Sequence, residues 1–127
     1  MTHQELANGF CKFVYDFTNE GNNIKFINKT DEMFYRVCFQ KLYYALYHKM
    51  LQHDPNLSES NAPGKHETIM QKIKNTHDSQ LIQIYAKMKS LRLWADYEPS
   101  DIPNTTSNIQ YYQYQVYKIL KRKVINI

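Results

Sequence analysis

The stretch from Asp31 to His53 constrains the fold of this chain more than any other part of the sequence. Of its 23 residues, 14 are apolar or aromatic, and no glycine or proline interrupts them. A helix of this length runs about 35 Å at 1.5 Å per residue. Apolar side chains fall on most of its sides, so other helices must surround it. The sequence therefore predicts a long, buried central helix.

Polar and charged side chains interrupt this stretch, which is therefore too polar to span a membrane. They include Arg36, Gln40, Lys41 and His48. At about 100° per residue, Lys41, His48 and Gln52 fall on one narrow stripe, where we first expect chemistry. His48 is either a histidine hydrogen-bonded to a neighbouring helix or a proton donor and acceptor suited to neutral pH.

Amphipathic periodicity predicts further helices around the central one, separated by the polar stretches 56–64 and 100–107. They are a helix from the capping box Thr2–Glu5 to about Asn19, a short helix that opens at Lys65, a helix after the cap Thr76–Ser79 that runs through Ala95, and a last helix from Asn108 to about Ile125.

Length and composition agree with one helical domain that spans residues 1–127. The chain has 43% hydrophobic residues, three glycines and four prolines, which disfavours disorder. Strand alternation and internal repeats are missing from the sequence, so we expect an all-α, up-and-down bundle of four long helices and one short helix. The absence of a leader pattern or a membrane-length apolar run, and two cysteines without disulfide spacing, indicate a cytoplasmic protein.

Charge and motif content narrow the possible ligands. The net charge of +4 and the pI near 9.0 are compatible with a polyanionic partner. Metal-binding spacings and a glycine-rich phosphate loop are both missing, so we expect neither a metal site nor a cofactor. Tyrosine can fill a core or stack on unpaired bases, and we expect most of the 11 tyrosines to fill the core. We expect the cationic run Lys118–Lys123 to complement a helix dipole rather than to bind RNA.

Arg92 and Asp96 stand four residues apart on a predicted helix, a spacing that favours an ion pair. The pair is either a solvated surface contact or a guanidinium that is presented to a phosphate, with Tyr97 beside it. His66 likewise either caps its short helix or takes part in such a site. The residues alone leave both alternatives open.

Three short motifs together resemble the HEPN superfamily of helical nucleotide-binding domains, in its small single-domain prokaryotic branch. They are KLYYALYH at Lys41–His48, GKH at Gly64–His66 and LRLWADY at Leu91–Tyr97, and the resemblance covers roughly residues 30–123. It implies a helical bundle that often forms homodimers. Many members are metal-independent ribonucleases of toxin–antitoxin, CRISPR or phage-defence systems.

The resemblance also implies roles for individual residues. In the family, an Arg-x(4–6)-His motif pairs across the dimer, the Arg binding the scissile phosphate and the His handling the proton. Arg92 matches the Arg, but Tyr97 stands where the His is expected, and the sequence has no His after Arg92. A phenol is a poor base at pH 7. Either His48 or His66 supplies the proton function from another helix, or the domain binds RNA without cutting it.

The leading hypothesis is therefore a cytoplasmic HEPN-type ribonuclease or RNA binder of a prokaryotic defence or toxin–antitoxin module. Its expected catalytic residues are Arg92, His48 and Tyr97, and its expected RNA- or phosphate-binding residues are Lys41, His66, Lys65 and Asp96. The alternative is a non-catalytic nucleotide-binding or protein-interaction module that partners a nucleotidyltransferase. A third hypothesis is a helical adaptor whose tyrosines only pack.

Overall fold

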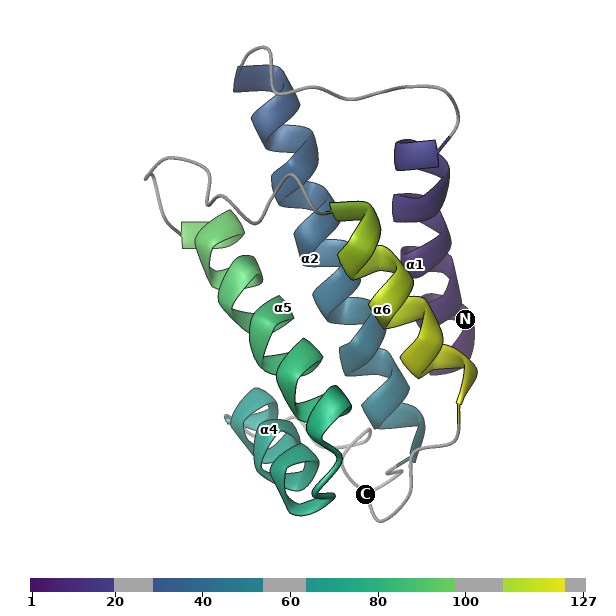
Figure 1. Ribbon diagram of the computed structural model, residues 1–127, viewed down its shortest axis with the longest axis vertical. Helices are drawn as coiled ribbons and strands as arrows, with labels where there is room; N and C mark the ends of the chain where they lie inside the picture. Colours follow the sequence, from purple (N-terminus) through teal and green to yellow (C-terminus); the bar gives the residue numbers. More distant parts are fainter. Residues whose placement is uncertain (20–28, 54–63, 98–108, 123–127) are drawn as a thin grey trace.

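The computed structural model describes residues 1–19, 29–53, 64–97 and 109–122, and within these ranges the chain forms five α-helices. Helices α1, α2, α5 and α6 run alternately up and down, and α4 lies at the lower end of the bundle (Figure 1). This confirms the predicted all-α bundle of four long helices and one short helix. The bounds are α1 His3–Asn19, α2 Lys29–His53, α4 Lys65–Asn75, α5 Ser79–Tyr97 and α6 Ile109–Lys121.

Helix α2 is the central element, because α1, α5 and α6 all pack against it and α4 touches it. Its buried side chains recur at three- and four-residue steps, as predicted for a helix that others surround. Its first turns differ from that prediction, since Met33 and Phe34 are 59% and 45% exposed. The buried residues are Tyr35, Cys38, Phe39, Leu42, Tyr43, Ala45, Leu46, Met50 and Leu51.

The predicted helix boundaries are largely confirmed. The Glu5 N–H donates to Thr2 Oγ1 over 3.0 Å, and the Thr2 N–H donates to Glu5 Oε1 over 3.2 Å, so α1 begins with a reciprocal capping box. Asp78 Oδ1 accepts a hydrogen bond of 3.1 Å from the Leu81 N–H and caps α5. Helix α6 ends at Lys121, before the predicted end.

Several sequence predictions fall outside the described residues. They are the helix stop at 20–23, the connector 24–27, residues 56–63 of the predicted loop 56–64, the linker 100–107, and Lys123 of the cationic run. Within the described part, the expected N-cap segment at 28–31 is partly helical, since α2 already includes Lys29. None of the helices that the structure describes is both long and apolar enough to cross a membrane.

Six of the 11 tyrosines fill the core or pack against it, including the partly buried Tyr44 and Tyr47, as expected for most of them. All 11 lie in the described residues, and four of them are buried: Tyr35, Tyr43, Tyr85 and Tyr112. Five are exposed: Tyr15, Tyr97, Tyr111, Tyr114 and Tyr117. Tyrosine carries both a ring and a hydroxyl, and it is therefore accommodated on either side of a helix.

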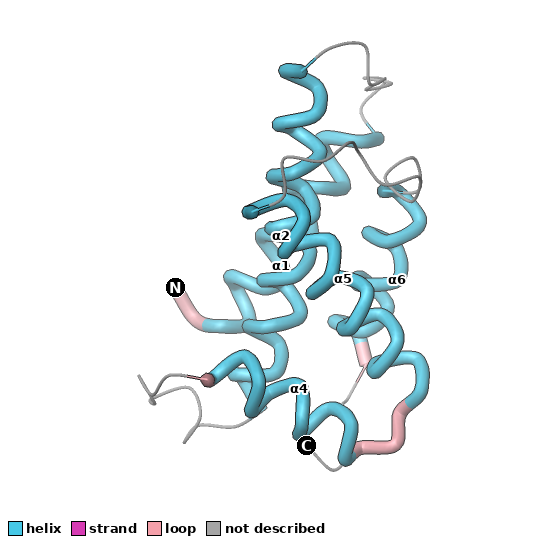
Figure 2. The backbone as a smooth tube through the Cα atoms, turned by 90° about the vertical axis from the view of Figure 1, so that its left-hand side faces the viewer, coloured by secondary structure: helices cyan, strands magenta, loops and turns pink. Residues whose placement is uncertain are grey.

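Helix α4 brings residues far apart in the sequence into one region. Its apolar side, Ile69, Met70 and Ile73, is buried, and α4 packs mainly on α5. A salt bridge of 2.6 Å from Lys89 Nζ to Glu67 Oε1 joins the first turn of α4 to α5. Figure 2 shows α4 at the lower end of the bundle after a rotation of 90°. This docking places the start of α4 beside α2 and α5.

Candidate functional site

Arg92 extends from α5 over two tyrosine rings of α2. Its Cζ lies 5.3 Å from the ring centroid of Tyr43 and 5.5 Å from that of Tyr44. Burial opposes its charge, but Tyr44, Asp96 and Tyr43 outweigh that effect, and the pKa of Arg92 is raised above its ordinary value. The guanidinium is therefore a fixed positive charge against an aromatic surface.

The predicted ion pair between Arg92 and Asp96 is confirmed, with 2.9 Å between Nε and Oδ2. The direction of the N–H is unsuited to a hydrogen bond, and Nε is buried without a hydrogen-bond partner. The Arg92 side chain is 15% exposed. A guanidinium has five N–H donors in a fork that matches a phosphate or carboxylate, so this side chain retains donors for an anionic ligand.

His66, in the first turn of α4, reaches the same tyrosine rings. Its Nδ1 lies 2.6 Å from the Tyr43 hydroxyl, and the ring of Tyr47 stacks on it with centroids 4.5 Å apart. Burial lowers the pKa of His66, and the positive charges of Arg92, Lys89 and Lys65 lower it further. The imidazole is therefore neutral at pH 7, the form that accepts a proton.

Tyr43 contacts both Arg92 and His66. Its side chain is fully buried, and its oxygen accepts a hydrogen bond of 3.3 Å from the Tyr85 hydroxyl, which is also fully buried. Burial raises the pKa of Tyr43 to about 12 and raises the pKa of Tyr85 as well. Both phenols therefore stay protonated at neutral pH and hold the His66 ring in a defined orientation.

His48 makes an edge contact with the Tyr47 ring, on which His66 stacks. The centroids of Tyr47 and His48 are 5.5 Å apart, so one ring touches both histidines. The Nδ1 of His48 lies 2.8 Å from the Nδ1 of His3, and the two imidazoles stack. Burial lowers the pKa of His48, and the charges of His3 and Lys65 lower it further.

The predicted polar stripe of α2 faces α1. Besides the contact of His48 with His3, the Lys41 ammonium lies 4.8 Å from the Phe10 ring centroid, and Gln52 Nε2 donates to Gln4 Oε1 over 3.4 Å. These contacts explain why polar residues are placed along an otherwise buried helix: their side chains lie at the edge between two packed helices.

The expected site residues thus form two neighbouring groups. Arg92, Asp96 and His66 surround the Tyr43–Tyr44 rings, whereas His48 and Lys41 lie on the α1 side. Tyr97, at the end of α5, is 69% exposed and adds to the raised pKa of Arg92. Lys65 opens α4, and its charge acts on His66 and on His48.

Sequence reasoning missed four contributors: Tyr43, Tyr47, Tyr85 and His3. Tyr43 and Tyr47 lie inside the KLYYALYH stretch, and the four-residue step between them could have shown that they share a helix face. His3 and Tyr85 carry no such signal, because their partners are 45 and 42 residues away.

Comparisons with known proteins found no match: no family model, no curated protein and no solved structure matches this chain. Across residues 1–19, 29–53, 64–97 and 109–122, no three His, Cys, Asp or Glu side chains are grouped to hold a metal ion. The side chains that meet at the site are a guanidinium, a carboxylate, an imidazole and phenols.

Proposed function

We propose that this chain is a HEPN-type, metal-independent ribonuclease in which Arg92 and His66 act together on a phosphodiester. One observation carries the proposal: Arg92 and His66 meet at the same residue, Tyr43. The guanidinium lies 5.3 Å from the ring centroid, and the imidazole Nδ1 lies 2.6 Å from the hydroxyl. A phosphate-binding fork and a neutral base on one rigid support are what cleavage by a 2′-hydroxyl requires.

The proposed proton transfer uses the tautomer in which the His66 Nδ1–H donates to the Tyr43 oxygen; the 2.6 Å contact fits this donor as well as the Tyr43 O–H. The Tyr43 oxygen has two lone pairs, so it can accept the Tyr85 O–H and the Nδ1–H of His66 together. In that tautomer His66 Nε2 carries a lone pair, and it can remove the proton from the 2′-hydroxyl. The 2′ oxygen then bonds to phosphorus, and the bond from phosphorus to the 5′ oxygen breaks.

The remaining expected residues have supporting roles in this proposal. Arg92 stabilises the extra negative charge of the phosphorane. Tyr97, an exposed phenol near Arg92, supplies the proton for the leaving 5′ oxygen. Lys65 attracts the strand at the start of α4, and Asp96 positions Arg92. His48 and Lys41 bind RNA on the α1 side of the Tyr47 ring.

The test is cleavage of single-stranded RNA by purified protein in EDTA. We expect Arg92→Ala and His66→Ala each to lose about a hundredfold in rate or more, as for other removed general bases and charge-stabilising donors. Arg92→Lys keeps the charge without the fork and should retain part of the rate. His77→Asn is the matched control, because His77 is an exposed histidine at φ 57, a conformation that asparagine tolerates.

The outcomes separate the alternatives. Loss of activity in His48→Ala but not in His66→Ala would return the proton transfer to His48, as first expected. Wild-type protein that binds RNA through Arg92 and cuts nothing would leave the ribonuclease proposal refuted.

The second candidate is a non-catalytic nucleotide- or RNA-binding module. It is favoured by the sequence after Arg92, which contains no histidine. In this function Arg92 still binds an anion, and the tyrosines and histidines only support it. Protein that neither binds nor cuts RNA would favour the protein-interaction module with a nucleotidyltransferase-type partner.

Both candidates fit a cytoplasmic protein of a prokaryotic defence or toxin–antitoxin module, and we propose that it acts as a homodimer. Leu93 and Tyr97, exposed by 42% and 69%, both follow Arg92 along α5 and offer an apolar contact beside the site. Sedimentation of wild-type protein and of Leu93→Asp tests this: a dimer that the substitution dissociates supports the proposal, and a monomeric wild-type protein refutes it.

A further inference from the structure

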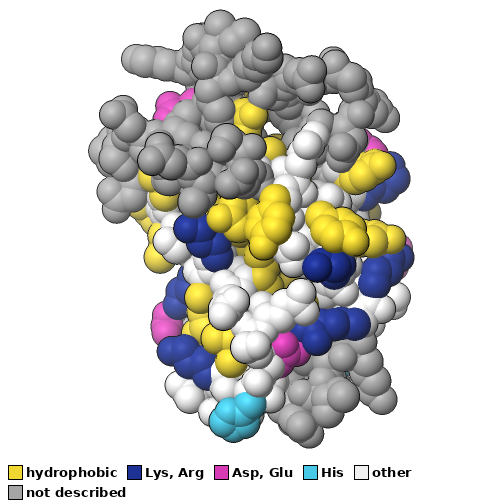
Figure 3. All heavy atoms as spheres, viewed as in Figure 1, with side chains coloured by type: hydrophobic (Ala, Val, Ile, Leu, Met, Phe, Trp, Pro, Cys, Tyr) yellow, Lys and Arg dark blue, Asp and Glu magenta, His cyan; other side chains and the backbone are white. Residues whose placement is uncertain are grey.

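Helix α6 presents an aromatic and basic face to solvent. Tyr111, Tyr114 and Tyr117 are exposed by 58%, 55% and 43%, although the opposite side of α6 is buried in the bundle. At about 100° per residue these three rings and two lysines fall within an arc of about 120°. Figure 3 shows hydrophobic and Lys or Arg side chains side by side on the face of the molecule where α6 lies.

The lysines of this face lie against its rings. Lys118 Nζ is 5.1 Å from the Tyr114 ring centroid, and Lys121 Nζ is 5.3 Å from that of Tyr117. The sequence of α6, IQYYQYQVYKILK, has no acidic residue. Exposed rings at this density are uncommon on a surface without a partner. The face therefore combines flat aromatic surfaces with positive charge that is not neutralised within its own helix.

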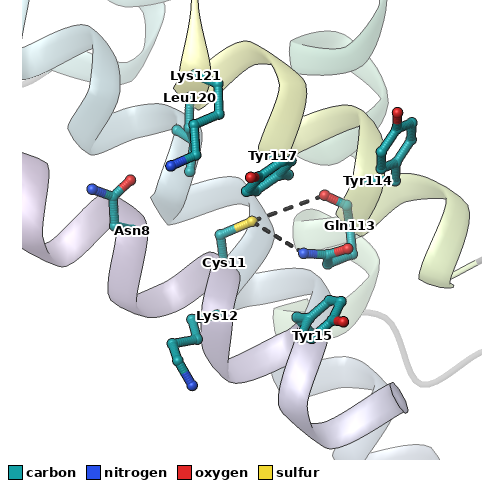
Figure 4. Close-up of a pocket in the computed structure, with 9 residues that line it drawn as sticks. All are labelled: Asn8, Cys11, Lys12, Tyr15, Gln113, Tyr114, Tyr117, Leu120 and Lys121. Carbon is teal, nitrogen blue, oxygen red and sulfur yellow. Dashed lines mark hydrogen bonds between the residues drawn. The ribbon is translucent and has the colours of Figure 1, made fainter.

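A groove of about 560 Å³ between α1 and α6 continues this surface. Figure 4 shows Tyr15 of α1 and Tyr117 of α6 on opposite sides of it, with Cys11 and Gln113 between the two helices. Cys11 Sγ donates to the Gln113 carbonyl over 3.9 Å, and burial raises the thiol pKa to about 11. The groove therefore offers rings and lysines for binding, but no reactive thiol.

We propose that the α6 face, defined as Tyr111, Tyr114, Tyr117, Lys118 and Lys121 with the adjoining groove, binds single-stranded RNA. Unpaired bases stack on tyrosine rings regardless of sequence, and lysines bind the phosphates between them. Two tyrosines three residues apart are separated by about 4.5 Å along the helix axis, so the face suits two or three nucleotides. A second copy of this chain fits poorly, because two such basic faces would repel each other.

This binding site goes beyond the proposed cleavage, because it shares no residue and no helix with Arg92, His66 and Tyr43. The cleavage residues lie on α2, α4 and α5, and the α6 face lies on α6 beside α1. The two sites share only the class of ligand. The α6 face would hold a strand on the protein while another part of the strand is cut.

The test is fluorescence anisotropy with a labelled single strand of 2′-O-methyl oligouridine. Because its 2′ oxygens are methylated, binding is measured whether or not the protein cleaves RNA, so failure of the proposed cleavage leaves this test intact. We expect Tyr114→Ala with Tyr117→Ala to weaken binding by about tenfold per ring, and the corresponding Phe variants to bind as wild type. Phe34→Ala on α2, at 45% exposure, is the matched control for loss of an exposed ring.

The lysines should affect the salt dependence of RNA binding. Lys118→Ala with Lys121→Ala should lower the slope of log affinity against log salt by about 1.4, or about 0.7 per lost phosphate contact. Lys74→Ala, an exposed lysine of α4, should leave it unchanged. Wild-type protein that does not bind the strand, or tyrosine variants that bind it as tightly as wild type, would overturn the proposal, as would equal affinity for the duplexed oligonucleotide.

Discussion

The hydroxyl of Tyr43 should contribute to the free energy of unfolding through Tyr85 more than through His66. The Tyr85 O–H is fully buried and donates to the Tyr43 oxygen over 3.3 Å. His66 is half-buried, and water can replace its lost partner. Tyr43→Phe therefore leaves one buried donor without an acceptor, which costs about 1–3 kcal/mol. Tyr85→Phe removes only a long hydrogen bond and should cost about 0.5–1.5 kcal/mol.

The double variant distinguishes this mechanism from simple loss of two hydroxyls. With both phenols replaced by phenylalanine, the unpaired buried donor disappears, so the two costs do not add. We expect Tyr43→Phe with Tyr85→Phe to lose about 1 kcal/mol less than the sum of the single variants. In thermal unfolding, each 1 kcal/mol is about 4 °C for a domain of this size.

The assay is urea unfolding followed by circular dichroism, with the slope against denaturant compared among all four proteins. Equal slopes show that the denatured states are alike and that differences in midpoint report stability. Tyr111→Phe is the matched control, because that ring is 58% exposed and its change should stay within about 0.5 kcal/mol. Single-variant costs that add up to the cost of the double variant would show that the two hydroxyls are not coupled, and the reasoning would be wrong.

Three other predictions follow from burial. Leu42→Ala should cost about 2–5 kcal/mol in urea unfolding because Leu42 is fully buried, whereas Met33→Ala at 59% exposure should cost under about 0.5 kcal/mol; similar losses would contradict the packing. The two buried cysteines, with pKa values raised by burial to about 11 and about 12, should react with a thiol reagent only after unfolding, and fast reaction of native protein would refute this. Because burial and nearby positive charge lower the pKa values of His48 and His66, the unfolded chain binds more protons below about pH 6.5, and the free energy of unfolding should fall on acidification. A double substitution of both histidines by glutamine should make this fall shallower, and an unchanged fall would assign it to other groups.

The fold was predictable because local sequence marks each long helix: α1 and α6 are amphipathic, α2 is apolar on most of its sides, and α5 begins with a cap. The capping box of α1 and the cap of α5 each lie within a few residues of the helix they start, so local sequence determines them. Burial of α2 was predicted from apolar residues on most of its sides. Local sequence does not specify which helix packs on which side of α2. That packing determines what surrounds the polar stripe. Lys41, His48 and Gln52 contact α1, whereas Arg92 lies over the rings of Tyr43 and Tyr44.

The same limit applies to the choice between His48 and His66. Both histidines are partly buried, both have lowered pKa values, and both touch Tyr47. The difference is tertiary: α4 docks on α5 through the Lys89–Glu67 salt bridge and its buried apolar side, and this carries His66 to Tyr43. His66 and Arg92 meet at Tyr43 only because α4 docks in this way. The periodicity of α4 or of α5 alone does not contain this information.

The exposed tyrosines of α6 were, in contrast, within reach of the sequence. Ile109, Val116 and Ile119 lie within an arc of about 80° on one side of the helix, which fixes the direction of the core. Measured from that direction, Tyr111, Tyr114 and Tyr117 point away from it, so their exposure follows from helix phase alone. Counting 11 tyrosines in 127 residues obscured this, because a count averages residues of opposite phase. The phase of each ring relative to the buried stripe, and not the abundance of the residue, separates a core tyrosine from one that is available to a ligand.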